Sequence, residues 1–201
     1  MTNTAASTSR PVLADRLVAR GAATDVALVL GGVAVVSALA QVQVPLWPVP
    51  VTGQTLGVML VGASLGARRG ALSLATYLVL GVAGLPIFAE FSGGPLSVLK
   101  PSFGFVIGFV VAAAVIGWLS ERDWDKKWWR SAAAFFLASL IPFAVGLPYL
   151  AVVLGSLGLP NGLPSVLAAG LYPFIVGGIA KWLIAAAALP LAWRALKRIG
   201  D

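Results

Sequence analysis

The segment from Pro173 to Leu191 restricts the fold of this chain more than any other stretch. It is long and apolar enough to cross a bilayer as a helix, and Lys181 is its one charged residue. A charged side chain at membrane depth costs about 3 kcal/mol on insertion scales, so Lys181 is a candidate functional residue. The alternative is a lysine that reaches the lipid surface, roughly 12 Å away along the helix. Gly177 and Gly178 leave space beside the lysine, which favours a cavity.

The composition is that of an integral membrane protein. Hydrophobic residues make up 59% of the 201 residues and charged residues only 10%, whereas soluble domains contain about 25% charged residues. The absence of cysteine and histidine excludes disulfides, thiol catalysis and histidine metal ligands, so we expect no cofactor and no metal. The net charge of +7 follows the turns between apolar segments, which indicates membrane topology rather than nucleic-acid binding.

Six apolar segments predict an all-α, polytopic integral membrane protein with six transmembrane helices. Residues 1–21 are polar and lack the apolar core and cleavage site of a secretory signal, so we expect a flexible cytoplasmic tail. Residues 22–201 then form a single six-helix membrane domain. The expected spans are about 26–42, with Asp25 as its cap, 51–65, 71–82, 103–119, 132–154 and 173–194.

The distribution of basic residues predicts the orientation of these spans. Twelve of the 14 lysines and arginines lie in the two terminal segments and in the turns at 66–70 and 121–130. The loops on the opposite side contain only Lys100, and Lys181 lies within a span. Because positively charged segments remain in the cytoplasm, both termini are predicted to be cytoplasmic.

Small residues four positions apart mark the first span and allow another helix to approach closely. We consider two interpretations, internal packing or a docking face for a partner membrane protein. The residues concerned are Ala27, Gly31, Ala34 and Ala38. In the fifth span, Pro142 and Pro148 predict a bend whose freed backbone groups face protein or a cavity.

Hydrogen-bonding and aromatic residues gather on the predicted outer side, together with Lys181. One cation, several polar groups and many aromatic rings suit a small, mostly apolar ligand with an anionic group and a polar head. The candidate binding residues are Lys181, Gln54, Thr52, Tyr77, Phe88, Phe174, Gly178 and Tyr149.

Common catalytic motifs are absent from the sequence. It contains no G-x4-G-K-[ST] phosphate loop, no G-x-S-x-G and no H-E-x-x-H, and no acids are paired within the spans. A membrane enzyme acting on a lipid and a structural subunit without a ligand therefore remain less favoured alternatives. Binding and transport suit these residues better than catalysis.

Several motifs, in order, resemble the BioY biotin transporters, the substrate-binding S components of energy-coupling factor transporters. Residues 48–56, PVPVTGQTL, are similar to the P-x-P-x-T-x-Q-T-L stretch of that family. The similarity continues through LGARRGALS at 65–73, GLPIFA at 84–89, the glycines at 93–94, 101–109, and Pro173-Phe174 with Lys181. It covers nearly the whole chain after the N-terminal tail.

The resemblance implies high-affinity biotin binding and uptake at the cytoplasmic membrane. Lys181 is then expected to meet a polar end of biotin, most simply its carboxylate, while Thr52, Gln54 and Tyr77 supply hydrogen bonds. Phe88 and Phe174 are expected to cover the rings. The implied partners are a transmembrane coupling protein, docked on the small-residue face of the first span, and a pair of ABC-type ATPases. Some members of the family work alone, as homo-oligomers.

Two positions depart from the pattern of the family. Members usually have G-P-T-G-G-Y-L where residues 100–106 read KPSFGFV, and an acid where Gly178 stands three residues before Lys181. Loss of this acid removes an acceptor for the ureido N–H groups, which keeps another small vitamin or carboxylate open as the ligand. Lys100 is either a solvated loop charge, which we favour at this point, or a second contact for a carboxylate.

Overall fold

Helices form nearly all of the regular structure in the computed structural model, which describes residues 12–19 and 21–200. The one sheet is a short antiparallel hairpin in which Gln43 pairs with Thr52 and Val44 with Val51. In chain order, the elements are α1 Ala14–Leu17, α2 Ala22–Gln41, β1 Gln43–Val44, β2 Val51–Thr52, α3 Gln54–Leu65, α4 Ala67–Val82, the 3-10 turns η1 Ala89–Phe91 and η2 Pro95–Leu99, α5 Phe103–Ser120, α6 Trp128–Ser156, α7 Leu163–Gly170 and α8 Phe174–Gly200.

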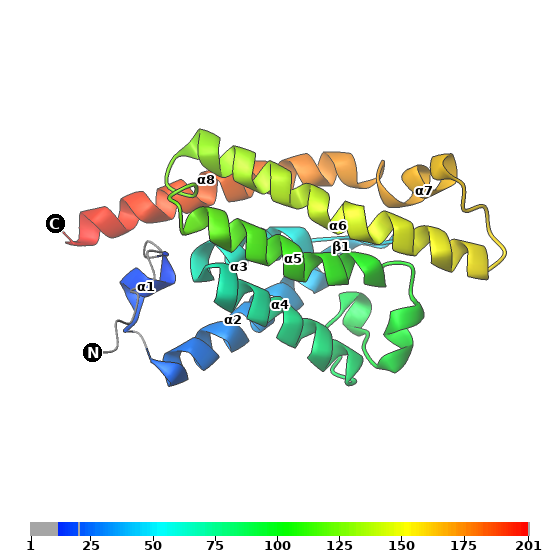
Figure 1. The fold of residues 1–201 in the computed structure, drawn as a ribbon, viewed down its shortest axis with the longest axis horizontal. Helices are drawn as coiled ribbons and strands as arrows, with labels where there is room; N and C mark the ends of the chain where they lie inside the picture. The colour runs from blue at the N-terminus through cyan, green and yellow to red at the C-terminus, as the bar shows by residue number, and fades with distance from the viewer. Residues whose placement is uncertain (1–11, 20, 201) are drawn as a thin grey trace, which may run out of the picture.

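Helix α5 lies at the centre of the bundle and packs against α3, α4 and α6, while α8 packs against α3 and α6 (Figure 1). It is apolar around its whole circumference, and 67% of the residues in its most apolar stretch are buried. The corresponding share in α2 is only 17%, so most of that helix faces outward. A helix that is apolar on all sides belongs in the core or in lipid, and both environments occur here.

Four described helices are long and apolar enough to cross a membrane, namely α2, α5, α6 and α8. The all-helical membrane class is therefore confirmed. Helix α3 has 12 residues and α4 has 16, fewer than the roughly 20 that a full crossing needs. The expected spans at 51–65 and 71–82 correspond to these two shorter helices.

Several boundaries differ from those predicted. Asp25 does not cap α2, because the helix begins at Ala22 and the Asp25 carboxylate pairs with Arg69 instead. The segment at 51–52 is a strand, and α3 begins only at Gln54. Helix α6 remains continuous through its two prolines. These lie in different environments, since Pro142 is buried and Pro148 is exposed.

Helix α6 approaches α5 closely at Pro142 because Gly108 lies opposite. A Cβ atom added to Gly108 would lie 2.7 Å from the Pro142 Cα atom, too close for any larger residue without a backbone shift. At the other side of the bundle, Gly32 of α2 packs on Ser73 of α4 in the same way. Small residues thus set the helix spacing at buried contacts, as is usual between membrane helices.

The two ends of the bundle differ in charge. We call the end formed by the α3–α4 and α5–α6 turns the basic end, because it contains Arg68, Arg69, Arg122, Lys126 and Lys127. Helix α1 and the C-terminal end of α8 lie on this side, at the left in Figure 1. The opposite end, which we call the loop end, contains the hairpin region 42–53 and the connections at 83–102 and 157–173.

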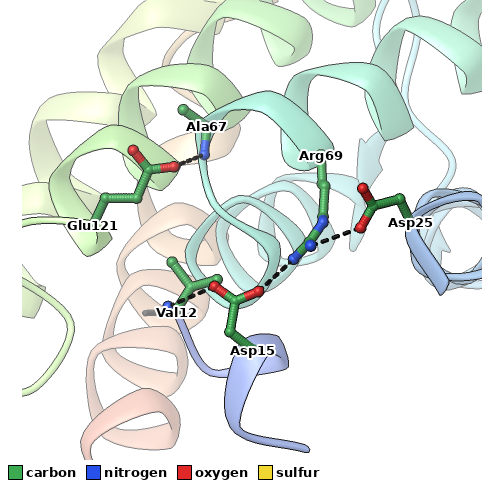
Figure 2. A network of polar contacts seen from close by, with 6 residues as sticks. All are labelled: Val12, Asp15, Asp25, Ala67, Arg69 and Glu121. Carbon is green, nitrogen blue, oxygen red and sulfur yellow. Dashed lines mark hydrogen bonds and ion pairs between the residues drawn. The ribbon is translucent and has the colours of Figure 1, made fainter. Parts of the chain in front are cut away.

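A network of ion pairs closes the basic end (Figure 2). Arg69 donates from one guanidinium nitrogen to Asp15 at 2.8 Å and from the other to Asp25 at 2.6 Å. Glu121 accepts a hydrogen bond from the Ala67 backbone N–H at 2.8 Å, which ties the α5–α6 turn to the start of α4. Asp15 belongs to α1, so residues 14–17 of the expected tail pack on the bundle, while residues 1–11 lie outside the described part of the chain.

Candidate ligand-binding site

A cavity of about 290 Å³ opens at the loop end of the bundle. This volume is at the lower end of the range for small-molecule sites. Its walls come from the hairpin, α3, η1, η2, α5, α6 and α8, so segments far apart in the sequence meet here. The lining residues are Leu46, Trp47, Pro48, Val49, Pro50, Thr52, Gln54, Thr55, Phe88, Ala89, Glu90, Ser92, Ser97, Lys100, Pro101, Ser102, Phe103, Phe105, Val106, Phe109, Pro142, Phe143, Phe174 and Lys181.

A chain of hydrogen bonds forms one wall of the cavity. The Thr52 hydroxyl donates to Gln54 Oε1 at 2.8 Å, and Gln54 Nε2 donates to the Tyr77 hydroxyl at 2.7 Å. The Tyr77 hydroxyl in turn donates to the Ile87 carbonyl at 3.1 Å. This order fixes which side of the Gln54 amide carries its oxygen, and it satisfies polar groups that are almost fully buried.

Lys181 reaches this wall from α8. Its Nζ donates to the Thr52 backbone carbonyl at 2.8 Å, a bond between residues far apart in the sequence. An ammonium group has three N–H donors, and the described residues provide Lys181 with this one hydrogen bond and no ion pair. Since Lys181 lines the cavity, its remaining donors are available to a ligand.

Aromatic rings also line the cavity. Phe105 of α5 stacks on Phe174 of α8 with ring centroids 6.0 Å apart, and Phe143 of α6 meets both edge-on at 5.8 and 5.9 Å. Phe88 packs edge-on against Tyr77, with centroids 5.2 Å apart. Such edge-to-face and offset contacts are the preferred arrangements of aromatic rings, and here they leave an apolar surface for a ligand.

Five of the predicted binding residues line one cavity, namely Lys181, Thr52, Gln54, Phe88 and Phe174. Tyr77 stands behind Gln54 and holds its amide rather than facing the cavity. Whether these residues contact a ligand stays a prediction.

Tyr149 and Gly178 were also predicted and are not among the lining residues. The Tyr149 hydroxyl donates to the Val98 carbonyl, and its ring packs against Phe103 at 6.1 Å, so this residue holds η2 against α6. A Cβ atom added at Gly178 would have no neighbour within 4 Å, and the space beside Lys181 is therefore open on that side. Their ligand contacts likewise stay a prediction.

Several lining residues escaped sequence reasoning. Phe105 and Phe143 lie in long apolar stretches, where nothing in the sequence distinguishes the cavity side of a helix from its other sides. Thr55 is not one of these, because its place beside Thr52 and Gln54 in the sequence marks it as either a helix cap or a ligand contact. Ser97 and Glu90 belong to an irregular connection in which Glu90 has φ 61°. The direction of such a loop residue depends on tertiary contacts that the sequence does not display.

The small-residue face of α2 is separate from the cavity. Ala27, Gly31, Ala34 and Ala38 are all exposed, and a Cβ atom at Gly31 would meet nothing within 4 Å. The adjacent Gly32 belongs to the buried face of the same helix. Internal packing within this chain therefore does not explain the small residues, and the face is open to lipid or to a partner.

Fold and cavity together define a class: a multi-pass membrane protein with a small cavity, polar and aromatic, between its helices at one end. Comparison with known proteins identifies the family. The BioY family model matches residues 6–198, and the chain belongs to that family. It is accordingly a multi-pass protein of the cell membrane.

Relatives and a solved structure agree with this assignment. The "Biotin transporter BioY" of Rhizobium etli is 38% identical over 69% of this chain and 75% of that relative. The protein of the same name from Thermotoga maritima is 33% identical over 73% of this chain and 82% of its own length. The fold is similar to that of the S component for biotin from an ECF-type ABC transporter, with a TM-score of 0.71 at 22% identity, covering 88% of this chain and 95% of that one.

Proposed function

We propose that the chain binds biotin in the loop-end cavity and serves as the substrate-binding component of an energy-coupling factor transporter. The curated relatives are named for biotin transport, and the cavity matches the parts of that ligand. Biotin combines a ureido head, an apolar ring and chain, and a carboxylate. The observation that carries the proposal is Lys181, a cation with spare N–H donors at a cavity lined by aromatic rings.

The second candidate function is binding of another small vitamin or carboxylate in the same cavity. Gly178 stands where the family usually has an acid, so one acceptor for ureido N–H groups is missing near Lys181. A competition panel separates the two candidates: radiolabelled biotin is bound to the purified chain and displaced by biotin, by other vitamins and by simple carboxylates. Displacement by biotin at the lowest concentration supports the proposal. Stronger displacement by another compound would reassign the ligand.

We also propose that six helices cross the membrane with both chain termini in the cytoplasm. The location of α1 and of the C-terminal end of α8 at the basic end supports this topology, since basic segments remain in the cytoplasm. Topology can be tested by labelling single introduced cysteines, since the sequence contains no native cysteine that would also react. Leu99→Cys at the loop end should react with a membrane-impermeant maleimide in intact cells, whereas Lys127→Cys should react only after permeabilisation. The reverse pattern would invert the topology.

Energy for uptake is proposed to come from partners, a transmembrane coupling protein and a pair of ABC-type ATPases, with no catalysis by this chain. The exposed small residues of α2 are the proposed docking face, because they allow close helix approach. Ala34→Leu combined with Ala38→Leu should abolish co-purification with the coupling protein and leave biotin binding intact. Val35→Leu, a change at another exposed residue of α2, is the control. An assembly that survives both leucines would exclude this face.

An uptake assay tests transport itself. The chain is expressed in a bacterium that can neither make nor import biotin, either alone or together with the coupling protein and both ATPases. Growth on trace biotin only with the full set supports the proposed assembly. Equal growth with the chain alone would show a solitary transporter, for which a homo-oligomer is the expected form. No growth in either case, with the proteins present in the membrane, would contradict the proposed function.

A further inference from the structure

The three acids of the α5–α6 turn at the basic end all have partners within the chain. Glu121 accepts the hydrogen bond from the start of α4. Asp123 forms an ion pair with Lys126. The buried Asp125 carboxylate accepts a hydrogen bond from Trp193 Nε1 at 2.6 Å. The negative charge of the turn is therefore used inside the protein.

The other cations of this region have no acid partner. Arg122, Lys127 and Arg130 form no ion pair among the described residues. The first two are exposed and Arg130 is partly exposed. Arg122 donates from one guanidinium nitrogen to the Trp118 carbonyl at 2.9 Å, which leaves most of its five N–H donors available. The outer surface of the turn is thus positively charged, with spare hydrogen-bond donors.

Exposed tryptophans accompany these cations. Trp118 belongs to the last turn of α5, while Trp128 and Trp129 are the first two residues of α6, and all three are exposed. The Arg122 guanidinium carbon lies 3.7 Å from the centroid of the Trp118 ring, and that of Arg130 lies 5.1 Å from the centroid of the Trp129 ring. Stacking on an indole ring holds a guanidinium in place, so less conformational freedom is lost when it binds an anion.

The position of this surface in the fold indicates what it meets. The turn joins α5 to α6, two helices that are long and apolar enough to cross a membrane (Figure 1). Their ends therefore lie at the membrane–water interface, where tryptophan is enriched at the level of the lipid headgroups. A phosphate group at that level can accept two parallel hydrogen bonds from one guanidinium.

We propose that the outer surface of this turn binds the headgroup of an anionic phospholipid. We call it the lipid surface, and it consists of Trp118, Arg122, Lys127, Trp128, Trp129 and Arg130. Three cations without an acid partner favour a headgroup of net negative charge over a zwitterionic one, which carries its own ammonium group. The tryptophans favour a phosphate held in the membrane over a soluble one. The inference does not depend on the ligand of the loop-end cavity.

Native mass spectrometry of the full chain in detergent, titrated with phosphatidylglycerol or phosphatidylcholine, tests this proposal. We expect the wild type to bind phosphatidylglycerol more tightly. Arg122→Gln combined with Arg130→Gln should weaken phosphatidylglycerol by about 25-fold, roughly fivefold for each cation, and leave phosphatidylcholine unchanged. The matched control is Arg16→Gln combined with Arg68→Gln, which removes two exposed cations from the same end and should keep the wild-type affinity.

A third variant keeps the test decisive if the double variant does not fold. The Lys127 side chain has no hydrogen bond or ion pair among the described residues, so its loss does not disturb the turn. Lys127→Gln should weaken phosphatidylglycerol by about fivefold. Unchanged lipid affinity in a folded double variant, or in Lys127→Gln when it alone folds, would overturn the inference.

Three further outcomes would also overturn it. Equal binding of the two lipids by the wild type would show that the surface does not select charge. Displacement of phosphatidylglycerol by soluble glycerol phosphate would assign the surface to a free phosphate. A double variant that keeps its lipid preference but no longer co-purifies with the coupling protein and ATPases would assign it to a protein partner. Biotin titration of the same variants should match the wild type, which separates this test from that of the proposed function.

Discussion

The two ends of this bundle use charged residues in opposite ways. At the basic end, Arg69 pairs with two carboxylates, Asp15 and Asp25, and the network is closed within the chain (Figure 2). At the loop end, Lys181 has a single backbone carbonyl as its hydrogen-bond partner and lies at a cavity. A cation whose charge is compensated by carboxylates of the same chain stabilises the fold. A cation with spare donors at a cavity is suited to bind a ligand, so the same charge has different consequences at each end.

The largest expected effect comes from Lys181→Met. This change keeps a long apolar side chain and removes the ammonium group, so biotin affinity should fall by more than about tenfold, the value of a hydrogen bond to a charged group. The melting temperature should change little, because the described structure gives Lys181 one internal bond. Titration and thermal melting of the same preparation measure both. Unchanged biotin affinity in this variant would contradict the assignment of Lys181 to ligand binding.

Arg69→Met is the matched change at the basic end. It should destabilise the fold by about 2 kcal/mol, because two carboxylates lose a charged hydrogen-bond donor. Biotin affinity should remain that of the wild type, since Arg69 does not line the cavity. Thermal melting in detergent and ligand titration provide the two values. A variant with wild-type stability and weaker binding would contradict the division of roles.

Tyr77→Phe sharpens the comparison within the loop end. It removes the acceptor of the Gln54 amide and the donor to the Ile87 carbonyl, at a cost of about 1 kcal/mol in stability. Gln54 then loses its fixed orientation, and affinity should fall by about threefold. The effect is smaller than that of Lys181→Met because Tyr77 does not line the cavity. A larger loss than in Lys181→Met would indicate direct ligand contact.

The smallest effect concerns Asp125 in the α5–α6 turn. Burial raises the pKa of its carboxyl, while a hydrogen bond of 2.6 Å from Trp193 Nε1 partly opposes that rise. The folded state then holds the Asp125 proton more tightly than the unfolded state does. The contribution of this group to stability is therefore greatest at low pH, and it is lost as the pH rises from about 3.9 through the raised value.

Asp125→Asn removes this titration and keeps an acceptor for Trp193. Melting midpoints of the variant and the wild type, measured from about pH 4 to 8, should diverge, with the wild type losing stability relative to the variant as the pH rises. Ligand affinity should not follow this change. Parallel melting curves would show that the Asp125 carboxyl has the same pKa in the folded and unfolded chains.

Sequence patterns were sufficient for the features that depend on composition. The apolar stretches predicted the helices α2, α5, α6 and α8, and the isolated charge of Lys181 predicted a residue at a cavity. The exposure of Ala34 and Ala38 also agrees with a face that does not pack internally. Features of this kind follow from the cost of polar groups in lipid, which depends on the sequence alone.

Features that depend on tertiary contacts were not visible in the sequence. Asp25 was expected to cap a helix, but Arg69 lies within reach in the fold and forms an ion pair with it. The hydrogen bond from the Tyr149 hydroxyl to the Val98 carbonyl could not be foreseen either, and the ligand contact of Tyr149 stays a prediction. Ser97 was not predicted as a cavity residue. A serine in a loop stands out only when the structure shows that its hydroxyl is buried without a hydrogen-bond partner among the described residues.

Calorimetric titration of biotin into the purified wild-type chain tests the central claim most directly. The loop-end cavity is small and already formed among the described residues, so the account predicts tight binding of one biotin per chain. A folded chain that shows no heat of binding at any biotin concentration would contradict the account. The loop-end cavity would then have to be assigned to another ligand.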